Sequence, residues 1–238
     1  MLGTAIQIIK QASAELGLPI PVEAAASREQ QAQQMLALLN ACGNELVRSA
    51  EWQFLRKTAT ITLIDGQSEY PLASDFSKLM NQTLWETGNI YSVVGPVSGR
   101  QWAYLTNSVT LAPQYCFIIK NRAFQFAPAP GSNGTGTGTI TYDYYSEGWV
   151  ADYANNNQFA PIIVNDLDTP HFDFWLLVKF LKLKTWEAKG LDTQALRDDF
   201  MRTFNDVVGQ DHGAPVLLLS PRRFGLPTPI PPETGFGL

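Results

Sequence analysis

Apolar residues are spread around more than one face of the segment from Asp166 to Gly190 when it is drawn as a helix. Thr169 is a suitable N-cap, and Pro170 suits the first helical position, where a missing backbone N–H costs nothing. Gly190 suits the end, because glycine adopts a left-handed conformation cheaply. Lysines interrupt every turn, which argues against a membrane span. The pattern predicts a central helix packed by the chain's own helices, with contacts from a neighbouring subunit as an additional alternative. Its apolar positions are Phe172, Phe174, Trp175, Leu176, Leu177, Val178, Phe180, Leu181, Leu183 and Trp186.

Three further segments show the three- and four-residue spacing of amphipathic helices. Residues 3–16 form the first, and residues 191–210 form the last. Ser27 and Gln30 have the spacing of a capping box, which predicts that the second helix starts at Ser27. Within that helix, Gly43 costs about 1 kcal/mol. We therefore expect another helix to approach Gly43 closely, or else a kink there.

Between these helices the hydrophobic periodicity changes to two. The run T-A-T-I-T-L-I from residue 58 alternates as a half-buried strand does, and Asp65-Gly66 is a turn signal. We expect a small antiparallel β domain, either a sandwich or a partly closed barrel. Residues 131–138 suit a flexible hairpin tip, and the polar residues 151–165 lead the chain back to the helices. Further strand-like runs are Leu84–Trp85, Ile90–Val94, Val109–Leu111, Cys116–Ile119, Ala123–Phe126 and Thr139–Tyr145.

The end of the chain has a different composition. Its prolines are dense enough to exclude a helix, yet it holds more large apolar residues than a disordered tail usually does. An extended arm that docks on another chain fits both features, and residues 216–219 suit the addition of a strand to a partner's sheet. The arginines suit a partner's carboxylates or DNA. The predicted partner-binding residues are Val216, Leu217, Leu218, Leu219, Arg222, Arg223, Phe224, Ile230 and Phe236.

Taken together, these patterns predict an α+β fold with an inserted domain. Residues 1–57 and 165–212 form a helical bundle from the N-terminal helices and two C-terminal helices. Residues 58–164 form the antiparallel β domain, and residues 213–238 form the extended proline-rich C-terminal arm.

The composition narrows the class of protein. The chain has 238 residues, of which 45% are hydrophobic and 16% are charged, so it can bury a sizeable core but has little charge. A net charge of −5 argues against a protein that wraps nucleic acid by neutralising phosphates. Cys42 and Cys116 lie far apart, which predicts neither a disulfide framework nor a zinc site. No signal-peptide pattern is visible at the N-terminus, so a reducing, cytosolic setting is expected.

No motif in the sequence predicts catalysis. Asp166 and Asp168 form a D-x-D pattern that holds a metal in some enzymes, but a role in helix entry is favoured. His171 and His212 are too far apart for a ligand set. The Gly/Thr repeat at 134–138 lacks the lysine of a phosphate loop, and G-x-S-x-G is absent. We therefore expect no catalytic residue, no cofactor and no metal site.

Two alternatives involve the β domain. Its aromatic residues, if exposed, would suit a sugar-stacking platform, although sheet core is favoured. Glu147 and Asp152 would suit a glycan-cleaving enzyme only if they faced one cleft, and nothing in the sequence indicates this. The aromatic residues are Trp85, Tyr91, Trp102, Tyr104, Tyr142, Tyr144, Tyr145 and Trp149.

A series of short motifs occurs in a familiar order. It consists of Trp52-x-Phe54, then Y-P-L-x-x-D-F at 70–76, Gln101-Trp102, F-Q-F-A-P-A-P at 124–130, T-I-T-Y-x-Y at 139–144, D-L-D-T at 166–169 and K-G-L-D at 189–192. Over residues 27–210 this order resembles the head-to-tail adaptor proteins of short-tailed bacteriophages, of the tail tubular protein A type.

The resemblance implies a non-enzymatic structural virion protein of the tail neck, made in the host cytoplasm. It implies a helical bundle carrying a β domain, assembled as a ring of about twelve copies. Such a ring binds the portal protein on one side and the tail nozzle protein on the other, and DNA passes through its lumen without stable binding. Members commonly place a C-terminal arm against the portal, which would make the arm residues portal-binding. No membrane contact is implied.

Overall fold

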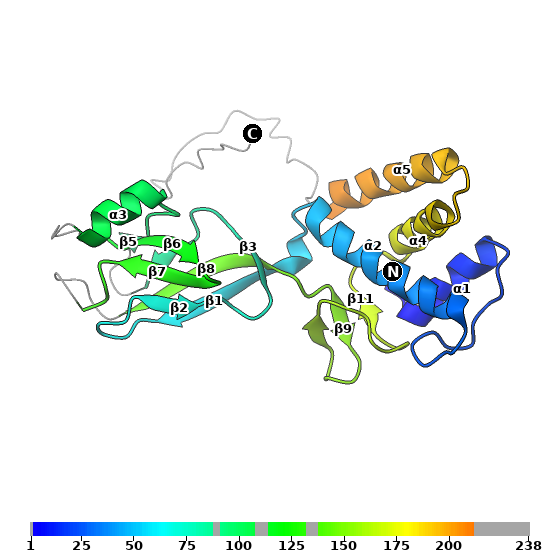
Figure 1. The fold of residues 1–238 in the computed structure, drawn as a ribbon, viewed down its shortest axis with the longest axis horizontal. Helices are drawn as coiled ribbons and strands as arrows, with labels where there is room; N and C mark the ends of the chain where they lie inside the picture. Colours follow the sequence, from blue (N-terminus) through cyan, green and yellow to red (C-terminus); the bar gives the residue numbers. More distant parts are fainter. Residues whose placement is uncertain (1, 88–90, 108–113, 132–137, 212–238) are drawn as a thin grey trace, which may run out of the picture.

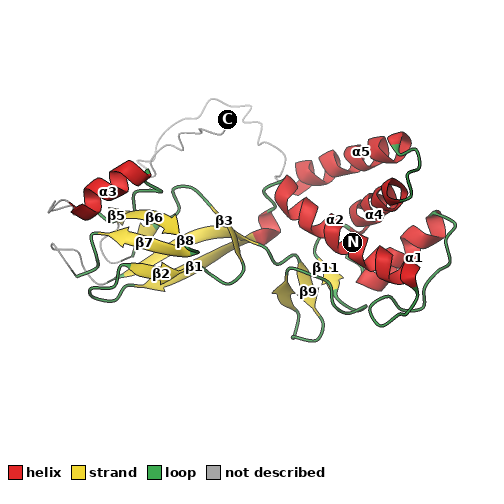
Figure 2. Ribbon diagram, in the orientation of Figure 1, coloured by secondary structure: helices red, strands yellow, loops and turns green. Residues whose placement is uncertain are grey.

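The computed structural model describes residues 2–87, 91–107, 114–131 and 138–211, and it shows an elongated molecule (Figure 1). We use the term helical part for residues 2–55 and 147–211, and β part for residues 56–146. Each part is built around its own cluster of buried apolar side chains. Helices and antiparallel sheets both contribute (Figure 2), so the predicted α+β class is confirmed.

The helical part consists of α1 (Ala5–Glu15), α2 (Gln30–Ser49), α4 (Phe174–Ala188) and α5 (Gln194–Asp211), with a short 3-10 turn at Gln53–Leu55. Helix α4 lies at the centre and packs against the other three. Because it has neighbours on several sides, it buries apolar residues on more than one face, and this confirms the predicted central helix. None of the helices in the described part of the chain has the length and hydrophobicity of a membrane-spanning segment.

The lysines that interrupt α4 each pair with an acidic residue on a different neighbouring helix. The bonds are Lys179–Asp199 to α5 at 3.0 Å, Lys182–Glu15 to α1 at 2.6 Å and Lys184–Glu45 to α2 at 2.8 Å. A lysine can bury its aliphatic stem while its ammonium group reaches the edge of the bundle. The charges on α4 are therefore compatible with its central position.

The start of α4 differs from the prediction, whereas its end agrees. The N-cap is Asp173, whose carboxylate accepts bonds from the backbone N–H groups of Trp175 and Leu176 at 2.9 and 3.1 Å. Thr169 and Pro170 are instead extended, because they pair with a strand at residues 150–151. At the other end, Gly190 has φ +68° and the backbone bonds of a Schellman motif, as expected for a glycine C-terminal to a helix.

Helix α2 requires two corrections. Its N-cap is Glu29 rather than Ser27. The Ser27 hydroxyl accepts a bond from the Glu29 N–H, two residues before the position that would cap the helix. Gly43 is indeed closely approached, but by the indole of Trp149 and not by another helix. A Cβ atom added at Gly43 would lie 2.1 Å from that ring.

The β part is a two-layered antiparallel structure. One sheet contains β1 (Arg56–Thr62), β8 (Thr139–Ser146), β4 (Trp85–Glu86), β5 (Tyr91–Ser92) and β3 (Phe76–Leu79), and the other contains β2 (Glu69–Pro71), β7 (Ala123–Ala127) and β6 (Cys116–Lys120). Side chains from both sheets meet in one aromatic-rich cluster that includes Phe124, Phe126 and Tyr142. This is the sandwich form of the two predicted alternatives. The strand-like run Val109–Leu111 and most of the predicted hairpin tip lie outside the described residues.

A small third sheet lies within the helical part. It consists of β9 (Val150–Asp152), β10 (Gln158–Ala160) and β11 (Thr169–Pro170). Strands β9 and β10 fall largely in the polar segment 151–165 that was expected to lead the chain back to the helices, and β11 falls in the predicted start of the central helix. Val150 is the first residue of β9, and Trp149 directly precedes it. Both side chains are buried in the cluster of the helical part. The domain boundaries at residues 57 and 165 stay a prediction.

Candidate functional site

The arm residues predicted to bind a partner, from Val216 to Phe236, lie outside the described residues. His212 lies outside them too. Partner binding by the arm therefore stays a prediction. The candidate sites among the described residues lie on the surfaces of the two parts.

The D-x-D pair holds loops together. The buried carboxylate of Asp168 accepts backbone bonds from Tyr153, Val164 and Asn165 at 3.0, 2.8 and 2.7 Å. The carboxylate of Asp166 accepts bonds from the N–H groups of residues 24 and 25 at 2.9–3.1 Å. Over the described ranges, no group of three metal-ligating side chains is present. The predicted role of the pair in helix entry is wrong, because Asp173 caps α4 and the two carboxylates bind loop backbone instead.

The remaining polar candidates form no catalytic arrangement. His171 packs between the rings of Phe54 and Phe159, and burial lowers the pKa of its imidazole. Asp152 accepts bonds from Ala154 and Asn155 of its own turn. Its carboxylate therefore stabilises a turn, and nothing indicates a shared cleft with Glu147.

Three of the aromatic residues considered for a sugar-stacking platform are buried. Tyr142 and Tyr144 are buried in the sheet cluster, and Trp149 is fully buried in the helical part, where its indole N–H donates to the Pro161 carbonyl at 2.8 Å. Trp85 and Tyr104 are exposed. The core interpretation is confirmed for the three buried residues, and the sugar-binding alternative gains no support.

A polar cluster connects the two parts. The Asp75 carboxylate accepts bonds from Lys57 Nζ, Tyr144 Oη and Ser146 Oγ at 2.6, 2.7 and 2.8 Å. Burial opposes ionisation of Asp75, but these three bonds outweigh it and lower the pKa of the carboxyl group. Lys57 also lies 4.9 Å from the ring centroid of Phe159, which belongs to the helical part. The cluster therefore helps to fix the β part against the helical part.

One apolar surface lies along α1, and we call it the α1 flank. It is an open groove of about 460 Å3 lined by Leu2, Gly3, Gln7, Lys10, Gln11, Ala14, Ile20 and Phe174. Leu2 and Ile20 are 53% and 58% exposed. Ala14 on α1 is small and exposed, so another element can approach the helix there, whereas Gly3 is buried against the Phe174 ring.

A second apolar surface lies where α5 meets α2, and we call it the α5 flank. It is a smaller groove of about 140 Å3 lined by Glu45, Leu46, Ser49, Phe180, Phe200, Met201 and Phe204. Helix α5 has 18 residues, but only Phe200 is fully buried, and Met201 is 45% exposed. The described residues thus cover the apolar stripe of α5 only in part.

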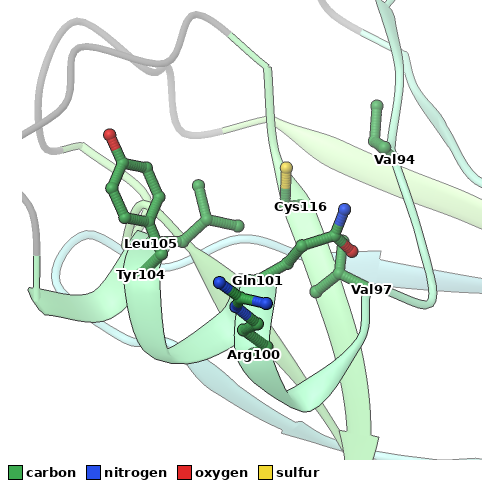
Figure 3. Close-up of a pocket in the computed structure, with 7 residues that line it drawn as sticks. All are labelled: Val94, Val97, Arg100, Gln101, Tyr104, Leu105 and Cys116. Atoms are coloured by element: carbon green, nitrogen blue, oxygen red, sulfur yellow. The ribbon is translucent and has the colours of Figure 1, made fainter.

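A third apolar pocket lies in the β part, beside α3 (Gly99–Asn107), a helix that the sequence analysis did not predict (Figure 3). The pocket has a volume of about 430 Å3 and is lined by Val94, Val97, Arg100, Gln101, Tyr104, Leu105 and Cys116. None of the described side chains of α3 is fully buried. The signal for this helix is the capping box of Ser98 and Gln101, whose side chains bond reciprocally to each other's backbone N–H at 3.1 and 3.3 Å.

The three surfaces are open and mostly apolar. The sequence of residues 4–216 matches the family described as SU10 adaptor protein. The chain belongs to this family, whose members are structural adaptor proteins of bacteriophages and typically non-enzymatic. It is thus a virion component that assembles with other virion proteins. The search of curated proteins found no match to an individual protein.

Proposed function

We propose that the chain forms the ring-shaped head-to-tail adaptor of a short-tailed bacteriophage, which joins the portal protein to the tail nozzle protein. The observation that carries this proposal is the family match over residues 4–216, which includes the helical part, the β part and the beginning of the arm. The order of short motifs from Trp52 to Asp192 supports the short-tailed type.

The ring contains about twelve copies in this proposal. A closed ring requires a heterologous interface, in which two different surfaces of each copy meet. The α1 flank and the α5 flank support such an arrangement, because they are apolar, different from each other and both present on every copy.

The arm provides the contact with the portal. The apolar run Val216–Leu219 suits strand addition to a partner's sheet, and Arg222 and Arg223 suit carboxylates of a partner. The lumen passes DNA without holding it, since a net charge of −5 disfavours the phosphate contacts that would slow DNA passage.

The experiment is a truncation after Gly213. The cut preserves Asp211, whose carboxylate accepts a bond from the backbone N–H of Gln53 at 2.8 Å, so the described fold keeps its contacts. We expect the truncated chain to keep the circular dichroism spectrum and melting temperature of the full chain but to lose co-sedimentation with the portal. A full-length variant with serine at positions 217–219 serves as the matched control for the apolar contribution. Normal docking of the truncated chain would show that the arm does not bind the portal.

A further inference from the structure

We infer that the α1 flank of one copy receives helix α5 of the next copy, with Met201 in the groove and Asp198 paired with Lys10. This inference rests on the proposed ring and identifies the two surfaces that build it. The occupant of the α1 groove is a second copy of this chain.

The position of the two helices favours a contact between copies. Helices α1 and α5 both pack against α4 and lie on different sides of it, as Figure 1 shows for the helical part. A copy therefore cannot place its own α5 into its own α1 groove. When the same two surfaces meet between copies, the contact is heterologous and generates a ring if the rotation closes.

The charges of the two flanks are complementary. Lys10 is the one charged residue that lines the α1 groove, and it has no ion-pair partner in the part of the chain that the structure describes. Asp198 lies three residues before Met201 on α5 and is exposed; within the described residues its carboxylate accepts a bond from Gln194 but has no cationic partner. Residues at i and i+3 share a face of a helix, so Asp198 and Met201 reach the same partner surface.

The shapes are also complementary. The α1 groove is open and largely apolar, which suits a helix laid into it. On α5, Met201 is exposed, whereas Phe204 and Val208 are half-buried against the cluster of the helical part. Methionine adapts its shape to irregular grooves. On the other side of the contact, Leu2 and Ile20 are positioned at the edge of the α1 groove to cover the apolar surface around Met201.

The first test is a disulfide cross-link between copies. Ile20→Cys and Met201→Cys are introduced together into a chain with Cys116→Ser, while Cys42 stays in place because it is fully buried. Rings assembled with the portal are oxidised mildly and separated by mass under denaturing conditions. We expect a ladder of covalent multimers from the double variant, and dimers only from a mixture of the two single variants. The control replaces Ile20→Cys by Leu191→Cys, which is similarly exposed but lies in the α4–α5 loop.

The second test is charge reversal. Lys10→Glu or Asp198→Lys alone places like charges opposite each other, and we expect each to weaken ring assembly at least about tenfold. Combining the two reverses the pair and should restore assembly to within about threefold of the original chain. Asp206→Lys is the matched control, since helical periodicity places Asp206 on a different side of α5 from Met201.

Each result bears on a different claim. This interface would be overturned if rings form but the cysteine pair does not cross-link and both single charge reversals are tolerated. The proposed adaptor function would not be affected by that result. If the unaltered chain forms no ring with the portal, the proposed function fails, and the interface that rests on it is overturned too.

Discussion

Gly43→Ala should destabilise the protein, although replacing glycine by alanine inside a helix normally helps. The new Cβ atom would lie 2.1 Å from the Trp149 ring, so the indole would have to move by about 1.3 Å to reach ordinary contact at 3.4 Å. Trp149 is fully buried, its N–H donates to the Pro161 carbonyl, and its ring contacts Phe172. It therefore has no free space into which to move.

The magnitude follows from three opposing contributions. Overpacking a core costs about 1–3 kcal/mol, and weakening the Trp149 hydrogen bond adds about 1 kcal/mol. The higher helix propensity of alanine stabilises the folded state by about 1 kcal/mol. We expect a net loss of about 2 kcal/mol, which lowers the melting temperature by about 4–8 °C for a chain of this length.

The assay is urea and thermal unfolding followed by far-UV circular dichroism, with two companion variants. Gly209→Ala in α5 is the matched control, because nothing lies within 4 Å of its added Cβ atom, and we expect it to be neutral or stabilising by up to about 1 kcal/mol. Trp149→Phe removes the clashing ring, so Gly43→Ala should cost less in that background. A Gly43→Ala variant that is as stable as the original chain would refute the close packing at this site.

Three further predictions concern Asp168, Asp75 and Cys42. Asp168→Asn should cost about 2–4 kcal/mol in the urea midpoint analysis, because one of the oxygens that accept three backbone N–H bonds becomes a donor. Because the pKa of Asp75 is lowered in the folded state, its contribution to stability is fully present above its unfolded pKa of about 3.9 and is lost as the pH falls through its folded pKa. Asp75→Asn should therefore reduce the pH dependence of the melting temperature below about pH 4. An unchanged pH dependence in that range would contradict this prediction. Cys42 is fully buried, and burial raises the pKa of its thiol, so Cys42 should react with a thiol reagent only after unfolding. Peptide mapping locates the labelled residue. Rapid labelling of Cys42 in the native chain would show that the packing of α2 described here is wrong.

The sequence was most informative where local chemistry and hydrophobic pattern agreed. The central helix could be predicted because its apolar residues cover several faces, and its end could be predicted because Gly190 needs a left-handed conformation. Strand β8 alternates strictly between buried and half-buried positions, so its period of two was unambiguous.

The failures occurred where contacts between distant residues determine the structure. Thr169 and Pro170 suit a helix start locally, but pairing with β9 holds them extended, and Asp173 caps the helix instead. Gly43 indicated a close neighbour without identifying it, because Trp149 is more than 100 residues away in the sequence.

The surfaces of the candidate site were the least predictable part. The α1 flank combines residues from α1, the following loop and the start of α4, and no pattern within one segment indicates that they form a groove. Helix α3 carried a recognisable capping box at Ser98 and Gln101, but its short length and few apolar residues hid it among strand signals. The arm was predicted from composition alone and stays a prediction.

The most direct test of the central claim, that this chain assembles as a ring adaptor, is a native mass measurement of the purified chain with and without the portal protein. The account predicts that the portal complex gains a mass close to about twelve times the 26.3 kDa of one chain. A chain that remains a 26.3 kDa monomer in the presence of portal, and adds no mass to it, would contradict the account.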